Sequence, residues 1–149
     1  MPIEHVQGDL LEVEGDIAHG CNTLGVMGAG VAKAIKEAHP PLFAQYKGIC
    51  DAGPPLLGES YPYLRPSGYF IFNLMTQDSV SADPTVRNVS YDAISESFKN
   101  MFYQMNQHGI TEVTIPYIGA GLGGGDWEVI EAIIRSECPK HITVKVTQL

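Results

Sequence analysis

Two glycine-rich segments, Gly25–Gly30 and Gly119–Gly125, constrain the fold of this 149-residue chain more than any other feature of its sequence. Each follows a short apolar run and precedes an apolar pattern of helical spacing, so each predicts a strand, a tight turn and a helix in succession. Glycine lets a bound group approach the backbone closely. The free N–H groups and the positive end of the dipole at a helix N-terminus attract anions. The sequence therefore predicts two anion-binding turns that together could hold a pyrophosphate.

Strand-like runs and helical patterns alternate along the rest of the chain. Val31, Ile35 and Ala38 recur at helical spacing. The proline pair at positions 40 and 41 ends this pattern, because proline removes a backbone donor and restricts the residue before it. The same criteria predict strands at 3–6, 17–21, 59–64, 69–75, 113–115 and 142–146, helices at 42–49, 90–107 and from the cap Asp126 to Pro139, and a loop at Gly53, Pro54 and Pro55.

This order of elements predicts an α/β fold. Its layers would be α/β/α, around a central mixed, mostly parallel sheet of about six strands. The length suits one domain, which we expect to cover residues 1–149. Ligands of such folds bind at the carboxyl ends of the strands, and both glycine segments fall on that edge.

The charge balance limits the partners of the chain. Nine Lys and Arg residues stand against seventeen Asp and Glu residues, which gives a net charge of −8. We expect no extended nucleic-acid surface, because such surfaces rely on cationic side chains, whereas backbone N–H groups suffice for a small phosphate. The first residues, Met1–His5, lack the features of a signal peptide, and no apolar run reaches the length of a membrane span. We therefore expect a cytoplasmic chain with no membrane partner.

Common phosphate-binding motifs do not account for these turns. A Walker A loop needs lysine after its last glycine, and here Val31 follows Gly30. The spacing of Gly119, Gly121 and Gly124 fits the dinucleotide fingerprint, but the strand after it is the last of the chain, which disfavours a dehydrogenase. The histidines and cysteines show no ligand spacing, so we expect neither a metal site nor a cofactor.

Four ordered motifs resemble those of the macrodomain family, and together they cover nearly the whole chain. They are Gly8–Leu10 after the first strand, Ala18–Asn22 as a strand ending in asparagine, Met27–Ala32 as a first phosphate turn, and Ile115–Leu122 followed by Trp127 as a second. The resemblance implies a three-layer α/β/α macrodomain that binds ADP-ribose or a close relative, free or attached to macromolecules.

The resemblance also implies roles for individual residues. Asp9 would accept a hydrogen bond from the adenine amino group, and Asn22 would bond the distal ribose hydroxyls; the alternatives are a cap residue and a turn-stabilising asparagine. Asp126 fits a helix cap better than a catalytic acid, and Trp127 fits the core. The implied binding residues are Asp9, Leu10, Asn22, Met27, Gly28, Ala29, Gly30, Val31, Thr76, Ile118, Gly119, Ala120, Gly121, Leu122 and Gly123.

Within the family, the chain departs from the glycohydrolases that use a catalytic lysine and aspartate. Gln77 follows the strand ending Leu-Met-Thr where they carry the lysine, and Gly123 stands where they carry the aspartate. Glutamine cannot form a Schiff base with an opened ribose, and glycine cannot move a proton. The resemblance therefore disfavours lysine-dependent removal of ADP-ribose.

His19 indicates a different chemistry. The segment His19–Asn22 resembles that of the yeast phosphatases in the family, which implies catalytic roles for His19 and Asn22 in hydrolysing ADP-ribose-1''-phosphate to ADP-ribose and phosphate. A second carboxylate would be Asp78 or Asp83. A buried, hydrogen-bonded core histidine is the alternative for His19. Two other functions stay open: a non-catalytic module that binds ADP-ribose, and a hydrolase of ADP-ribosyl or O-acetyl-ADP-ribose esters.

Overall fold

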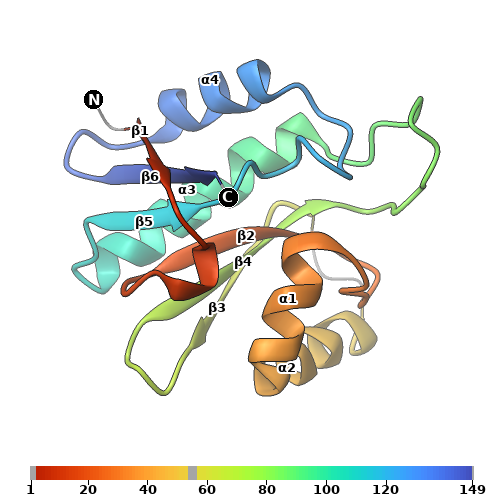
Figure 1. Ribbon diagram of the computed structural model, residues 1–149, viewed down its shortest axis with the longest axis horizontal. Helices are drawn as coiled ribbons and strands as arrows, with labels where there is room; N and C mark the ends of the chain where they lie inside the picture. Colours follow the sequence, from red (N-terminus) through yellow and green to blue (C-terminus); the bar gives the residue numbers. More distant parts are fainter. Residues whose placement is uncertain (1–2, 54–56, 149) are drawn as a thin grey trace.

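The computed structural model describes residues 3–53 and 57–148, so Pro54 and Pro55 of the expected loop lie outside the described residues. These residues form six strands and four α-helices, which are labelled in Figure 1. In order they are β1 (Ile3–Gln7), β2 (Ile17–Asn22), α1 (Gly30–Ala38), α2 (Pro40–Asp51), β3 (Ser60–Leu64), β4 (Phe70–Gln77), α3 (Tyr91–Gln107), β5 (Glu112–Ile115), α4 (Trp127–Glu137) and β6 (Thr143–Gln148). A short 3₁₀ helix at Leu10–Glu12, which the sequence pattern did not predict, follows β1.

All six strands form one sheet in the order β1-β6-β5-β2-β4-β3. Only β3 runs antiparallel to its neighbour β4, and the other neighbouring strands are parallel. The prediction of a mixed, mostly parallel sheet is confirmed. Its parallel strands direct their carboxyl ends to a single edge, where the loops that follow β2 and β5 contain the two glycine segments.

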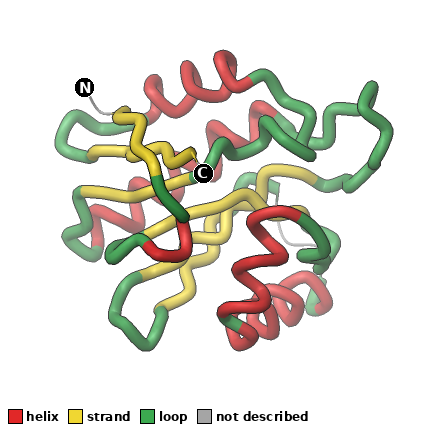
Figure 2. Tube along the Cα trace, in the orientation of Figure 1, coloured by secondary structure: helices red, strands yellow, loops and turns green. Residues whose placement is uncertain are grey.

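The sheet is covered on both faces, because alternate residues of its strands enter different cores. Phe72 and Leu74 of β4 pack in the core that includes Phe98 of α3. Ile71 and Met75 pack in the core that includes Ile35 of α1. Figures 1 and 2 show α1 and α2 together, apart from α3 and α4. The three-layer prediction is confirmed.

The helix boundaries follow local capping chemistry. The first helix ends at Ala38, before the proline pair as expected. The next helix begins at Pro40 rather than at Leu42, because proline suits the first helical turn, where its missing N–H would have no partner. The side chain of Asp126 accepts a hydrogen bond from the N–H of Glu128, which confirms the predicted cap of α4.

Candidate functional site

Both glycine segments line one cleft of about 610 Å³ at the carboxyl edge of the sheet. Of the expected binding residues, all but Asp9, Leu10 and Ala120 line it. Its walls come from the end of β2, the loop before α1, the end of β4 with the loop that follows, and the loop after β5. The sheet topology thus brings together residues that lie far apart in the sequence.

The first glycine segment leads directly into an uncapped helix. Ala29 occupies the N-cap position of α1 and provides no side-chain hydrogen bond, whereas Ser90 and Asp126 cap α3 and α4. The first backbone N–H groups of a helix have no partner within the helix. Since Ala29, Gly30 and Val31 line the cleft, these N–H groups and the positive end of α1 are available to an anion there.

The second glycine segment is a closely folded loop. Gly125 N–H donates to the carbonyl oxygen of Gly119 over 2.8 Å. A Cβ atom at Gly123 would lie 2.7 Å from the same carbonyl oxygen, which is too close for any side chain. This loop conformation therefore cannot accommodate an aspartate at position 123. Asp126 caps α4, as the sequence predicted, so the donors that this segment would offer to an anion are N–H groups of the loop.

The side chain of Asn22 is bonded within the loop that follows β2. Its Oδ1 accepts from the N–H of Leu24 at 2.9 Å and from the hydroxyl of Tyr46 at 2.8 Å. Its Nδ2 donates to the carbonyl oxygen of Val26 at 2.8 Å. The turn-stabilising alternative considered for Asn22 therefore describes part of its role, and the residue also lines the cleft.

His19 is buried, with 1% of its surface exposed. Its Nε2 lies 2.6 Å from Oδ1 of Asn73 on β4. The amide of Asn73 donates to the carbonyl oxygen of Tyr61, which fixes its Oδ1 as an acceptor, so Nε2 of His19 carries the hydrogen. Burial lowers the pKa of His19 to about 4, and the ring is neutral near pH 7. This is the geometry of the core-histidine alternative, although His19 also borders the cleft.

Neither carboxylate expected from the β4–α3 loop borders the cleft. Asp83 accepts hydrogen bonds from the N–H and hydroxyl of Thr85, which lower the pKa of its carboxyl group. Asp78 is exposed. Lysine, arginine, aspartate and glutamate are all absent from the described residues that line the cleft. Among the described residues, an anion in this cleft would therefore meet only uncharged donors.

Asn88 fastens the β4–α3 loop to the second glycine segment, and sequence reasoning missed it. It is 5% exposed and lines the cleft. Its Oδ1 accepts from the N–H of Ser81 at 2.9 Å, and its Nδ2 donates to the carbonyl oxygen of Leu122 at 3.1 Å. Sequence gave no signal for this residue, because its partner Leu122 is 34 positions away.

The expected adenine end lies beyond the lining of this cleft. Oδ1 of Asp9 accepts from the N–H of Leu11 at 3.0 Å and caps the 3₁₀ helix, as the cap alternative for this residue describes. Thr147 on β6 donates its hydroxyl hydrogen to the carbonyl oxygen of Gly8. This hydrogen bond therefore links the end of β6 to the residue that precedes Asp9.

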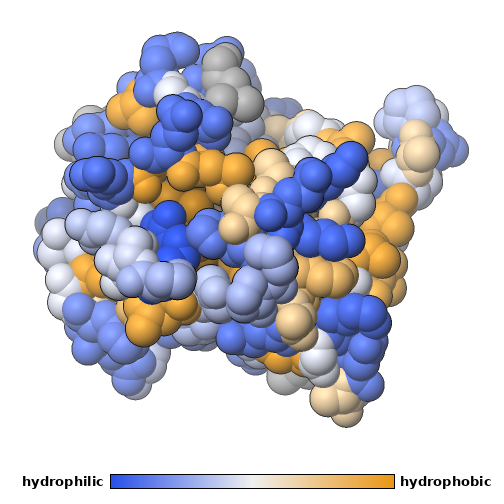
Figure 3. All heavy atoms as spheres, turned by 60° about the horizontal axis from the view of Figure 1, so that its bottom comes forward, coloured by the Kyte–Doolittle hydropathy of each residue, from blue (hydrophilic) through white to orange (hydrophobic). Residues whose placement is uncertain are grey.

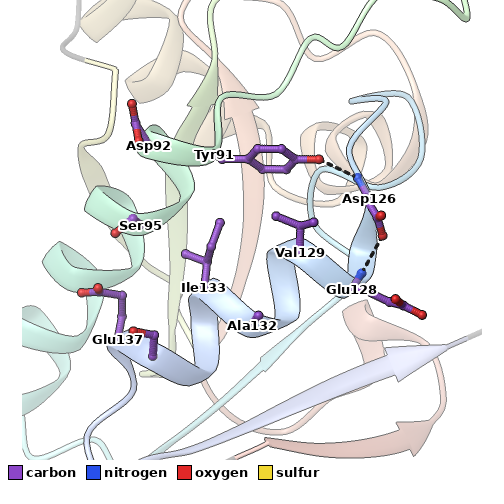
Figure 4. Close-up of a pocket in the computed structure, with 10 residues that line it drawn as sticks. Tyr91, Asp92, Ser95, Asp126, Glu128, Val129, Ala132, Ile133 and Glu137 are labelled. Carbon is purple, nitrogen blue, oxygen red and sulfur yellow. Dashed lines mark hydrogen bonds between the residues drawn. The ribbon is translucent and has the colours of Figure 1, made fainter.

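A second hollow, of about 660 Å³, lies between α3 and α4 (Figure 4). Val129 and Ile133 extend into it, and the hydroxyl of Tyr91 accepts a hydrogen bond from the N–H of Asp126 at its end. It contains none of the residues expected to bind a ligand.

Apolar residues also reach the surface in several areas bordered by hydrophilic ones, as the face in Figure 3 shows.

Residues 3–53 and 57–148 contain neither a cluster of metal-binding side chains nor a candidate membrane-spanning helix. No group of three His, Cys, Asp or Glu residues there could hold a metal ion. No helix in that part of the chain has the length and apolar character needed to span a membrane.

The sequence is similar to a known family and to individual proteins. A family model described as Macro domain matches residues 18–134. An uncharacterized 17.5 kDa protein of Enterobacteria phage T4 is 32% identical over 94% of this chain and 92% of its own. An ADP-ribose 1''-phosphate phosphatase of Lodderomyces elongisporus is 28% identical over 90% of this chain and 91% of that enzyme. A DNA ADP-ribosyl glycohydrolase of Thermus aquaticus is 27% identical over 89% of this chain but 37% of its own length.

Solved structures share the fold. A protein of unknown function from Bacteroides thetaiotaomicron has a TM-score of 0.89 and 26% identity, over 100% of this chain and 99% of its own. The macrodomain of Mycobacterium tuberculosis DarG has a TM-score of 0.86 and 24% identity, over 99% of this chain and 97% of its own. Thermosipho africanus DarTG, solved in complex with ADP-ribose, has a TM-score of 0.81 and 19% identity, over 97% of this chain and 41% of that one.

Proposed function

Because this chain belongs to the Macro domain family, we propose that it binds ADP-ribose in the cleft at the carboxyl edge of its sheet. One observation carries this proposal: the uncapped N-terminus of α1 and the second glycine segment line the same cleft. Backbone N–H groups from both would hold the diphosphate. Asp9 would contact adenine, and Asn22 would contact the distal ribose beside Thr76. The Thermosipho africanus structure with ADP-ribose is consistent with this ligand.

The reaction that we propose is hydrolysis of ADP-ribose-1''-phosphate, as named for the relative from Lodderomyces elongisporus. Water adds to the terminal phosphorus, the bond from phosphorus to the 1'' oxygen breaks, and that oxygen takes a proton as ADP-ribose leaves. The backbone N–H groups that hold the diphosphate would position the terminal phosphate for this attack. Because Nε2 of His19 donates its hydrogen to Asn73, the neutral ring would accept a proton at Nδ1.

The first prediction concerns turnover. Purified protein incubated with ADP-ribose-1''-phosphate is expected to release inorganic phosphate, measured by a colorimetric assay. Asn22→Ala should lower kcat/KM by roughly tenfold or more, because it removes a hydrogen bond at the distal ribose and also the bonds to Leu24, Val26 and Tyr46 that order the loop after β2. Asn106→Ala, on the exposed side of α3, is the matched control and should leave the rate unchanged. Phosphate release that is absent while ADP-ribose still binds would rule out the phosphatase.

A second candidate function is a module that binds ADP-ribose, free or attached to macromolecules, without turnover. It is favoured by the absence of acidic and basic side chains from the described lining of the cleft, since water then has no carboxylate to activate it. Tight ADP-ribose binding without hydrolysis of any substrate supports this module. Hydrolysis of O-acetyl-ADP-ribose alone would indicate the ester hydrolase instead.

A further inference from the structure

Tyr46 of α2 lies behind the cleft and contacts the residue proposed to bind the distal ribose. It is 2% exposed, and its hydroxyl oxygen lies 2.6 Å from the backbone carbonyl oxygen of Asn22 and 2.8 Å from Oδ1 of the same residue. Both of these atoms are acceptors, so the hydroxyl donates, and its single hydrogen is shared between them. Burial raises the pKa of Tyr46, and the hydroxyl therefore keeps its hydrogen throughout the working pH range.

This contact lies at an irregular point of the sheet. The pairing of β2 with β4 changes register between Cys21 and Asn22, so the last residue of β2 leaves the regular ladder. At this irregular point the carbonyl oxygen of Asn22 accepts from Tyr46. A buried carbonyl without a partner is costly, so the hydroxyl stabilises the bulge itself.

The surrounding bonds settle the orientation of the Asn22 amide. The N–H of Leu24 and the hydroxyl of Tyr46 donate, so they require the oxygen of the amide on their side. The carbonyl of Val26 accepts, so it requires the NH₂ group. One hydrogen of that group is used by Val26, and the other meets no acceptor among the described residues.

We infer that Tyr46 is a positioning residue whose hydroxyl fixes Asn22 as a hydrogen-bond donor toward the distal ribose, and thereby makes the cleft prefer ADP-ribose to ADP. This inference rests on the proposed binding of ADP-ribose. ADP carries the same adenosine and diphosphate but no distal ribose. The ratio of the two affinities therefore reports on the contacts of the distal ribose, and the change of that ratio in a variant reports on the contact that the variant alters.

The test is calorimetric titration of wild-type and Tyr46→Phe protein with ADP-ribose and with ADP. The substitution removes one hydroxyl and keeps the ring packed. It should raise the Kd for ADP-ribose roughly fivefold to tenfold and the Kd for ADP less than twofold, as the loss of one oriented hydrogen bond implies. Tyr61→Phe is the matched control, because Tyr61 packs against the same core cluster, and it should change neither Kd.

A double substitution separates positioning from a general structural role. If Tyr46 acts through Asn22, adding Tyr46→Phe to Asn22→Ala should change the affinity ratio no further. Additive effects, or equal losses for both ligands, would overturn the inference. If the wild-type protein binds ADP and ADP-ribose equally well, the inference is wrong, but the proposal of nucleotide binding in the cleft still stands. If the protein does not bind ADP-ribose at all, the proposed function is wrong as well.

Discussion

At the scale of single residues, burial decides what His19 can do. A histidine on a strand suggests acid or base chemistry from sequence alone, because its ordinary pKa lies near neutrality. The same side chain enclosed between β2 and β4, with Asn73 as its partner, stays neutral. The sequence could not distinguish these situations, since Asn73 lies 54 positions away.

The burial of His19 predicts a pH dependence of stability. The pKa of about 4 in the folded chain lies below the ordinary value of 6.5, so between these values the unfolded chain binds a proton that the folded chain does not. The contribution of His19 to the free energy of unfolding is therefore complete above pH 6.5. It is lost as the pH falls from 6.5 toward 4, by roughly 3 kcal/mol in total.

Urea unfolding of wild-type and His19→Gln protein between pH 4 and pH 7 measures this dependence. The His19→Gln variant keeps a hydrogen-bond donor for Asn73 but has no group that titrates at this position. Its free energy of unfolding should therefore change less with pH than that of the wild-type protein. His141→Gln, at an exposed histidine that contacts Asn106, is the control for replacing a histidine by glutamine. Parallel curves for wild-type and His19→Gln protein would contradict the assignment.

At the scale of elements, the sequence predicted most strands and helices because proline, glycine and polar caps mark their ends. As expected, α4 begins directly after its cap Asp126 and ends shortly before Pro139. The 3₁₀ helix after β1 was missed because three residues carry no periodic pattern. The connection of the β4–α3 loop to the second glycine segment was missed because it depends on contacts distant in the sequence, such as that of Asn88 with Leu122.

Asn88 should therefore matter to stability more than a loop position normally does. Asn88→Ala removes bonds to the N–H and carbonyl of Ser81, to the hydroxyl of Ser79 and to the carbonyl of Leu122. Since these groups become unpaired, we expect a loss of about 2–3 kcal/mol in the free energy of unfolding. Chemical denaturation measures it. Asn106→Ala, which removes one exposed side-chain bond, to His141, is the control. A loss no larger than that of the control would contradict the role of Asn88 as a fastener.

At the scale of the whole molecule, the family resemblance predicted from four motifs is confirmed by the family model that matches residues 18–134. The resemblance could be recognised because glycine turns are local and ordered along the chain. The detailed site needed the folded sheet, which alone brings α1, the end of β4 and the loop after β5 to one cleft.

The overall charge gives a prediction at this scale. ADP-ribose is an anion, the chain carries a net charge of −8, and the described lining of the cleft has no charged side chain. Long-range repulsion should oppose binding, and salt screens it. Titrations at low and high sodium chloride should therefore give an affinity for ADP-ribose that holds or rises with salt. A steep fall in affinity with salt would indicate cationic contacts that this cleft does not contain.

The missing cap of α1 has a consequence for the free protein. Ala29 leaves the first turn of this helix without the side-chain acceptor that Ser90 and Asp126 give to α3 and α4. A bound diphosphate would supply that acceptor, so the ligand would complete a piece of secondary structure as well as occupy a site. Binding of the diphosphate and ordering of the first turn of α1 would then be coupled, so each would favour the other. Without the ligand, this turn is less stable than a turn with a capping side chain would be.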